Sequence, residues 1–158
     1  MSSTLRQWVD EAENIVIFTG AGMSTDSGIP DFRSPGGVWT RMAPIMFQDF
    51  MASEDNRIEA WRRKFAMSDE LGSPQPNDGH KAVAQLVARG KVSAVITQNI
   101  DNLHQDSGVA EEKIIELHGN GSYALCLDCD LRHELDDIRS VFEGGDMAKA
   151  PACHNCGG

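Results

Sequence analysis

The sequence predicts an α/β fold in which helices cover a parallel β-sheet, with further helices inserted between the first two strands. Three short apolar runs, at 15–19, 92–97 and 113–117, have the β-branched character of buried parallel strands. Segments with helical periodicity separate these runs. Two Cys-x-x-Cys pairs follow the last run and predict a small metal-binding module.

The N-terminal helix is expected to begin at Ser3 or Thr4, because Thr4 and Gln7 have the spacing of a capping box. The apolar residues of this segment recur at helical spacing, which predicts one buried stripe along the helix. They are Leu5, Trp8, Val9 and Ala12.

The region between the first two strands is expected to be mostly helical. Residues 44–70 have the pattern of two helices, and the second of these has one apolar side. That side carries Ile58, Trp61 and Phe65. Glycine, proline and asparagine are dense in 71–79, which predicts a linker. Another helix is expected from His80 to Arg89, with Gly90 at its end.

Composition and charge narrow the class of protein. The 158 residues are 41% hydrophobic, which is enough for one ordinary core, and the length favours a single domain. A formal net charge of −10 argues against a nucleic-acid-binding surface, which needs a basic face. The N-terminus has no signal-peptide pattern, and no apolar run is long enough to cross a membrane. We therefore expect a cytoplasmic protein that binds neither nucleic acid nor membranes.

A glycine-rich stretch, Gly20-Ala-Gly-Met-Ser-Thr-Asp-Ser-Gly-Ile-Pro-Asp-Phe-Arg33, follows the first strand directly. Small residues let a backbone approach a phosphate closely, and N–H groups at a following helix start can bind it. The ordinary dinucleotide fingerprint needs a third glycine at the position where this chain has Thr25, which disfavours a dehydrogenase. A glycine pair alone also fits a tight turn without a ligand, so the stretch by itself leaves both interpretations open.

Polar residues also follow the second and third strands. Thr97-Gln-Asn-Ile-Asp101 lies where open α/β sheets bind ligands, although such residues alone could simply form a turn. Glu116-Leu-His-Gly119 ends the third strand, and histidine is the side chain suited to proton transfer near neutral pH. His118 is therefore a candidate general base. Lone histidines are usually structural, which is the expectation for His80, His104, His133 and His154.

The two cysteine pairs predict a zinc site. Cys126-Leu-Asp-Cys129 and Cys153-His-Asn-Cys156 enclose residues 130–152, close to the spacing of four-cysteine zinc ribbons. Four thiolates fill a tetrahedral shell, so the zinc would be structural, with a redox role as the lesser alternative. Acidic residues in and between the pairs disfavour a nucleic-acid-binding ribbon. They are Asp128, Asp130, Glu134, Asp136 and Asp137.

Together these segments resemble the sirtuin family of NAD-dependent protein deacylases. The similarity rests on Gly-Ala-Gly-x-Ser-x-x-Ser-Gly-Ile-Pro-Asp-Phe-Arg, Thr-Gln-Asn-Ile-Asp-x-Leu-His, Glu-Leu-His-Gly and the cysteine pairs, in that order between Asn14 and Gly158. It implies that NAD is a co-substrate and that the substrate is an acetylated lysine of a protein or peptide. The acyl group would pass to ADP-ribose with release of nicotinamide, and Zn²⁺ would be structural.

The resemblance also implies roles for individual residues. The candidate NAD contacts are Gly20, Ala21, Gly22, Asp31, Phe32, Arg33, Gln98, Asn99, Ile100 and Asp101. Asp31 to Arg33 would form a mobile loop over the nicotinamide ribose, and Asp101 would accept a hydrogen bond from the nicotinamide amide. His118 would be the catalytic base that deprotonates a ribose hydroxyl. Asn99, the second candidate catalytic residue, would hold the ribose hydroxyls or an ordered water.

The resemblance implies a domain organisation as well. Residues 1–121 would be the N-terminal part of a Rossmann-like NAD-binding domain, with a helical insertion at about 38–76, and 122–158 would be the zinc module. Family members continue with the remaining sheet, so we expect a truncated chain that by itself binds NAD weakly and turns over poorly, if at all. The alternatives are an inactive zinc-bearing interaction module and a mono-ADP-ribosyltransferase. The inserted helices lack the Tyr-x-x-Arg pair of the subgroup that prefers acidic acyl groups, which favours acetyl-lysine.

Overall fold

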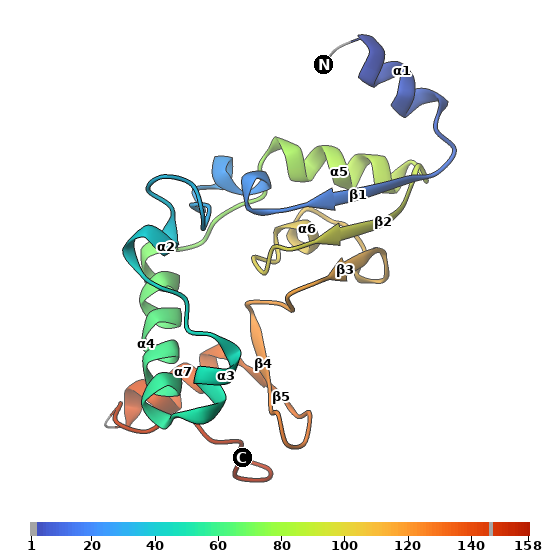
Figure 1. Ribbon diagram of the computed structural model, residues 1–158. Coiled ribbons are helices and arrows are strands. Elements are labelled where there is room, and N and C mark those ends of the chain that lie inside the picture. The colour runs from blue at the N-terminus through green and yellow to red at the C-terminus, as the bar shows by residue number, and fades with distance from the viewer. Residues whose placement is uncertain (1–2, 146) are drawn as a thin grey trace. The chain divides into compact units, whose positions relative to one another are not determined.

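The computed structural model describes residues 3–145 and 147–158 and divides into two compact units. The first, the sheet unit, contains the residues up to Asp31 together with Pro74–Asn120. The second, the cysteine unit, contains Phe32–Ser73 and Gly121–Gly158. Figure 1 labels the elements of both units. Part of the segment between the first two strands, Phe32–Ser73, therefore shares a unit with the cysteine pairs.

Three parallel strands form the sheet, in the order β1 (Ile15–Thr19), β2 (Val92–Thr97) and β3 (Ile114–Glu116). β1 pairs with β2 and β2 with β3, and the last residues of neighbouring strands lie opposite one another. The predicted parallel sheet is confirmed, and each strand lies within one residue of its expected bounds. The carboxyl ends of all three strands therefore share one edge.

Helix α5 (Asp78–Ala88) lies along one face of this sheet (Figure 1). The helix and the sheet enclose a buried apolar cluster of Val83, Val92, Val95 and Val109. Short elements complete the unit: η1 (Ala21–Met23), η2 (Thr25–Ser27), α6 (Leu103–Asp106) and η3 (Glu111–Lys113). η1 and η2 lie within the glycine-rich stretch, and α6 begins two residues after Asp101.

The other face of β1 is exposed. Val16 and Phe18 expose 56% and 60% of their surface, whereas Ile15 and Ile17 pack against the buried cluster. The expectation of a buried strand therefore holds for one face only. The β-branched composition of β1 indicates a strand of a sheet. It does not show whether other elements cover one or both faces of that strand.

The predicted stripe of the N-terminal helix α1 (Ser3–Glu11) is not buried. Trp8 exposes 65% of its surface and Leu5 exposes 45%, while Val9 and Ala12 are half-buried. The prediction of a buried stripe was wrong. Helical spacing identifies an apolar face, but burial also requires a second surface, which the described residues do not supply.

The cysteine unit combines helices with one hairpin. Its elements are α2 (Val38–Arg41), α3 (Phe47–Ala52), α4 (Glu54–Leu71), β4 (Tyr123–Leu125), β5 (Arg132–Glu134) and α7 (Leu135–Gly144). The two helices expected within 44–70 are confirmed as α3 and α4. The apolar side of α4 packs on α7, through Ile58, Phe65, Ile138 and Phe142. Across the described ranges, no helix has both the length and the apolar character that crossing a bilayer requires.

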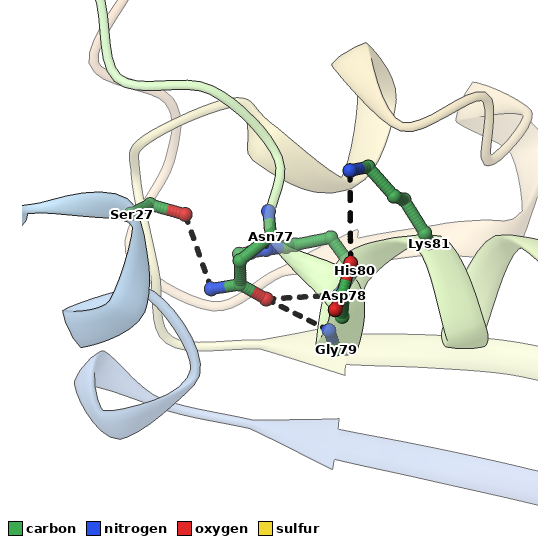
Figure 2. Close-up of polar contacts among 6 residues, drawn as sticks. All are labelled: Ser27, Asn77, Asp78, Gly79, His80 and Lys81. Atoms are coloured by element: carbon green, nitrogen blue, oxygen red, sulfur yellow. Dashed lines mark hydrogen bonds and ion pairs between the residues drawn. The ribbon is translucent and has the colours of Figure 1, made fainter.

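Asn77 determines where α5 begins. Its side-chain oxygen accepts hydrogen bonds from two backbone N–H groups of the first turn, and His80 completes a capping box (Figure 2). Its amide nitrogen donates to the carbonyl of Met23 at 2.8 Å and to Oγ of Ser27 at 3.1 Å. The helix therefore begins at Asp78, two residues before the expected start, and its cap is tied to the glycine-rich turn.

Candidate functional site

The predicted polar segments meet at the carboxyl edge of the sheet. The backbone N–H of Gln98 donates to the carbonyl of Thr19 at 3.0 Å, and that of Leu117 donates to the carbonyl of Thr97 at 2.9 Å. Strand pairing therefore continues one step past the ends of β2 and β3. It places the starts of the three polar segments beside one another, at the edge where open α/β sheets bind ligands.

The glycine-rich turn offers open backbone at this edge. After Gly20 the chain forms two short 3₁₀ turns and then reaches Gly28, whose φ of +85° is in the left-handed region. A Cβ built on Gly22 would meet no atom within 4 Å, so its backbone faces open space. Ala21 is half-buried beside it. This open backbone fits the close approach of a phosphate, as the sequence predicted.

A buried hydroxyl joins the glycine-rich turn to the segment after β2. Ser24, which is 1% exposed, donates from Oγ to Oδ2 of Asp101 at 2.6 Å. Asn99 donates from Nδ2 to Oγ of Ser24 and to the carbonyl of Gly20, each at 3.1 Å. Oδ1 of Asp101 accepts from the backbone N–H of Leu103 at 3.0 Å. Both polar side chains predicted here are therefore held in place.

Sequence reasoning assigned no role to Ser24. The available signal was its place in the glycine-rich stretch, but a small polar residue in a turn is common and says nothing about its partners. Gln98 and Ile100 differ from their neighbours because both are exposed, Ile100 by 39%. An exposed isoleucine beside fixed polar groups is suited to contact the face of an apolar ring.

His118 lies in the turn after β3 and is exposed. Oε1 of Glu116 accepts hydrogen bonds from the amides of Gln105 and Asn120, both at 2.7 Å. Asn120 also donates to Oδ1 of Asn102 at 3.0 Å. These contacts fix both sides of the turn against α6. The turn that carries His118 is therefore held in place, and its imidazole is accessible to a ligand.

The three residues of the predicted mobile loop fall on both sides of the unit boundary. Asp31 is the last residue of the first segment of the sheet unit, and Phe32 and Arg33 begin the cysteine unit. There, the ring of Phe32 lies 5.8 Å from that of Trp39, and the guanidinium of Arg33 lies 5.0 Å from the centre of the same ring. Trp39 was not predicted to take part.

Two histidines expected to be structural are among the most buried side chains of the sheet unit. His80 on α5 is 0% exposed and His104 on α6 is 1% exposed. Burial lowers the pKa of both rings below the usual value, because it penalises the charged form. The neighbouring His80 lowers the pKa of His104 further, whereas the charge of Asp101 raises the pKa of each ring. Both rings are therefore neutral at pH 7.

The four cysteines come together in the cysteine unit. The sulfur atoms of Cys126, Cys129, Cys153 and Cys156 all lie within 4.8 Å of one another. The Cys126–Cys156 and Cys129–Cys153 sulfur distances are 3.6 and 3.7 Å. Tetrahedral zinc with Zn–S bonds of about 2.3 Å requires sulfur atoms about 3.8 Å apart. The donor set and its spacing therefore fit a tetrahedral zinc ion.

The surroundings of the cluster act in opposite directions on two of its thiols. The backbone N–H of Gly158 lowers the pKa of Cys156, but the neighbouring sulfur atoms of Cys129 and Cys126 outweigh it and raise that pKa to about 12. Backbone N–H groups, first that of Cys156 and then that of Asn155, lower the pKa of Cys153 to about 5, and His133 contributes from 3.3 Å. The left-handed Gly157 donates its N–H to the carbonyl of Cys153 at 2.9 Å, which closes the turn. Crowded thiolates repel one another, so a cation is what stabilises such a cluster.

Comparison with known proteins decides the family. A family model described as the Sir2 family matches residues 20–158. The chain belongs to the Sir2 family. Within that family, an NAD-dependent protein deacetylase of Rhodopseudomonas palustris is 55% identical to it over 152 residues. NAD-dependent protein deacetylase 1 of Bradyrhizobium diazoefficiens is 54% identical over 152 residues. Each alignment covers 96% of this Sir2-family chain and 59% of the relative.

Solved Sir2 structures share the fold of this Sir2-family chain. One, a complex with a p53 peptide and NAD⁺, has 35% identity and a TM-score of 0.80, and it covers 99% of this chain. Another, with a deacetylated p53 peptide and 3′-O-acetyl-ADP-ribose, has 33% identity, a TM-score of 0.81 and 98% coverage. This chain spans 61% and 60% of those two proteins. The predicted α/β, Rossmann-like fold class is confirmed.

Proposed function

We propose that this protein is an NAD-dependent protein lysine deacetylase that transfers the acyl group to ADP-ribose and releases nicotinamide. The observation that carries the proposal is the edge of the sheet, where Ser24, Asn99 and Asp101 form one hydrogen-bonded group beside open glycine backbone. Two Sir2-family relatives that are 55% and 54% identical to this chain over 152 aligned residues bear the name of this activity.

NAD supplies the reactive ribose carbon that carries nicotinamide, and the residues of this chain bind and orient it. We assign the NAD contacts to the ten residues predicted from the sequence, from Gly20 to Asp101. The open backbone at Gly22 would receive phosphate, and Asp101, already oriented by Ser24, would accept from an amide N–H. Asn99 would hold ribose hydroxyls or a water molecule beside them.

His118 is assigned as the general base. Neutral imidazole has one nitrogen free to accept a proton, and the fixed turn after β3 leaves the ring accessible. Removal of a proton from a ribose hydroxyl makes its oxygen a better nucleophile. The proton then resides on the ring until it passes to solvent.

The cysteine cluster is assigned to structural zinc. Four thiolates complete a tetrahedral shell and leave no coordination position for water or substrate. We also propose the division into an NAD-binding part at 1–121 and a zinc module at 122–158. A cytoplasmic location is proposed because reducing conditions keep these four thiols available to metal.

The decisive experiment measures nicotinamide release from NAD by the zinc-loaded chain with an acetyl-lysine peptide. His118→Ala should reduce the rate by about 100-fold or more, because general bases contribute on that scale. Glu112→Ala, an exposed change shortly before β3, is the matched control and should act like the parent. A succinylated peptide should react more slowly than the acetylated one.

Two results would contradict the proposal. One is nicotinamide release by the parent that is equally fast without the acetylated peptide. The other is a His118→Ala variant that consumes NAD at the parental rate while remaining folded. Label transferred from NAD to protein, without deacetylation, would favour mono-ADP-ribosyl transfer in the same site.

A further inference from the structure

One histidine of the cysteine unit contacts a sulfur of the cysteine cluster from outside both Cys-x-x-Cys pairs. Nε2 of His133 lies 3.3 Å from Sγ of Cys153, which is 20 residues further along the chain. His133 is the middle residue of β5 and is half-buried. From the sequence, an ordinary structural role was expected for it. The contact instead joins the β4–β5 hairpin to the second cysteine pair.

The geometry of β5 explains why the imidazole faces the sulfur. Successive side chains of a strand point to opposite faces, so Arg132 and Glu134 lie on the face opposite to His133. They pair with each other there, 2.7 Å apart. Across the hairpin, His133 is paired with Ala124, whose small side chain leaves room for the ring. Strand alternation therefore turns the imidazole toward the cluster and the charged side chains away from it.

The chemistry of the cluster fixes the direction of this contact. The four ligand atoms that lie within 4.8 Å of one another are all cysteine sulfurs, so His133 adjoins a ligand and does not belong to the group. A sulfur that binds zinc is a thiolate without hydrogen, so it can only accept. The hydrogen must therefore belong to Nε2 of His133. This direction rests on the proposed assignment of zinc to the four cysteines, and not on the orientation of any hydroxyl group.

We propose that His133 is a positioning residue of the metal centre, whose Nε2–H donates to the thiolate of Cys153 and holds β5 against the second cysteine pair. Four thiolates carry more negative charge than one Zn²⁺ neutralises, and an N–H donor beside a sulfur stabilises the excess. His133 therefore acts through the sulfur that it contacts. It is not itself a zinc ligand.

Two neighbouring contacts differ from this one. Nδ2 of Asn155 donates to Sγ of Cys129 at 3.7 Å, which joins one cysteine pair to the other. The exposed ring of His154 packs edge to face on the ring of His133, with centroids 4.7 Å apart and planes inclined by 81°. His154 therefore contributes ring packing, whereas His133 contributes a donor from a strand to the cluster.

Nitrogen NMR of the His133 ring in the zinc-loaded chain tests the donor directly. At about pH 8, where imidazole is ordinarily neutral, the hydrogen should be on Nε2, with Nδ1 bare. Hydrogen on Nδ1 in the zinc-loaded chain would overturn the proposal. This measurement needs no substitution, so it does not depend on whether a variant folds. Absence of metal uptake would contradict the zinc assignment and this inference with it.

Two substitutions at His133 separate donation from packing. His133→Gln keeps an N–H donor near the position of Nε2 but loses the ring, whereas His133→Phe keeps a ring but loses the donor. His154→Phe, the same change on the neighbouring ring, is the matched control. Cobalt(II) in place of zinc gives the centre an absorption spectrum, because thiolate-to-metal charge transfer absorbs in the near ultraviolet.

In His133→Phe, the charge-transfer band should move to longer wavelength, because a thiolate without its N–H donor gives up an electron more easily. The zinc affinity of this variant, measured by competition with a chelator, should fall by about 10-fold. His133→Gln and His154→Phe should stay close to the parent in both measurements.

A packing role alone predicts the reverse order, because phenylalanine fills the place of the ring and glutamine does not. That reverse order, or a band and an affinity that stay unchanged in His133→Phe, would contradict the proposal. Neither measurement uses NAD or peptide. A His118→Ala variant that consumes NAD at the parental rate would therefore contradict the proposed deacetylation without affecting the role of His133.

Discussion

Gly22 and Gly28 lie in the same turn, and each position requires glycine for a different reason. Gly28 has a φ of +85°, which is strained for any residue with a Cβ, whereas Gly22 has ordinary backbone facing open space. Gly28→Ala should destabilise the sheet unit by about 1 kcal/mol. Gly22→Ala should leave the stability unchanged and weaken NAD binding, because the new methyl group occupies the approach of the phosphate.

Urea unfolding and NAD titration of both glycine variants check this difference. Equal NAD affinity of Gly22→Ala and the parent would show that the ligand does not approach this backbone. Gly28→Ala supplies the comparison, since its effect on NAD binding should follow from its effect on stability.

The buried histidines also predict how stability depends on pH. Their pKa values are lowered in the folded state, so the unfolded chain takes up protons first as the pH falls. Their stabilising contribution is therefore complete above about pH 6.5 and declines as the pH falls from there toward the folded-state pKa values. Each ring can change the free energy of unfolding by at most about 1.4 kcal/mol per pH unit.

Urea midpoints at pH 7.5 and 5.5 measure this effect, and the midpoint should be lower at pH 5.5. His80→Gln, which removes one of the two rings, should show a smaller difference. The pKa values of Asp69 and Glu134 are also lowered, by hydrogen bonds from Arg139 and Arg132. Those carboxylates lose their contribution only below about pH 4, outside this range. Equal midpoints at both pH values would contradict the prediction.

At the scale of the element, the stability of α5 depends strongly on its N-terminal cap. Asn77 satisfies two N–H groups of the first turn and holds Met23 and Ser27 with its amide nitrogen. Asn77→Ala should lower the free energy of unfolding of the sheet unit by about 1–2 kcal/mol. The cap of α4 is a suitable comparison, because Ser53 accepts only one bond, at 3.4 Å.

Ser53→Ala should therefore cost less than Asn77→Ala, and hydrogen exchange of the first turn of each helix measures both effects. An equal loss of protection in the two variants would show that the contacts of Asn77 with the glycine-rich turn contribute nothing. Those contacts are also how α5 helps to position the site.

The elements themselves were predictable to different degrees. β2 matches its expected bounds because a short β-branched run between breakers has few alternatives. The hairpin of β4 and β5 and the short helix α2 were not predicted, because three- or four-residue elements carry too little periodicity. The stripe of α1 was identified as apolar but wrongly predicted to be buried, since a periodic pattern describes one surface and burial requires two.

At the scale of the whole molecule, the two units have separate cores and should respond differently to loss of metal. The cysteine cluster joins the β4–β5 hairpin to the segment with Cys153 and Cys156, and thiolates this close repel without a cation. A strong chelator should therefore unfold this part of the cysteine unit. The sheet unit should keep its structure, because its buried cluster contains none of the cysteines.

Hydrogen exchange with and without chelator measures both halves of this prediction. Residues 123–134 should lose protection, while β2 and α5 should keep it. Cys153→Ser should reproduce the effect without chelator. Unchanged protection of the hairpin after metal removal would contradict a structural role for zinc.

The sequence by itself determined the three parallel strands, the helices α1, α3, α4 and α5, the cysteine spacing and the polar segments that follow each parallel strand. Those features are local sequence patterns, so they can be recognised before any tertiary contact is known. Only the tertiary structure decided that Ser24 meets Asp101 and that His80 faces His104. Residues so distant in sequence become neighbours only when the sheet register and the packing of α5 and α6 bring them together, and no local pattern encodes that geometry.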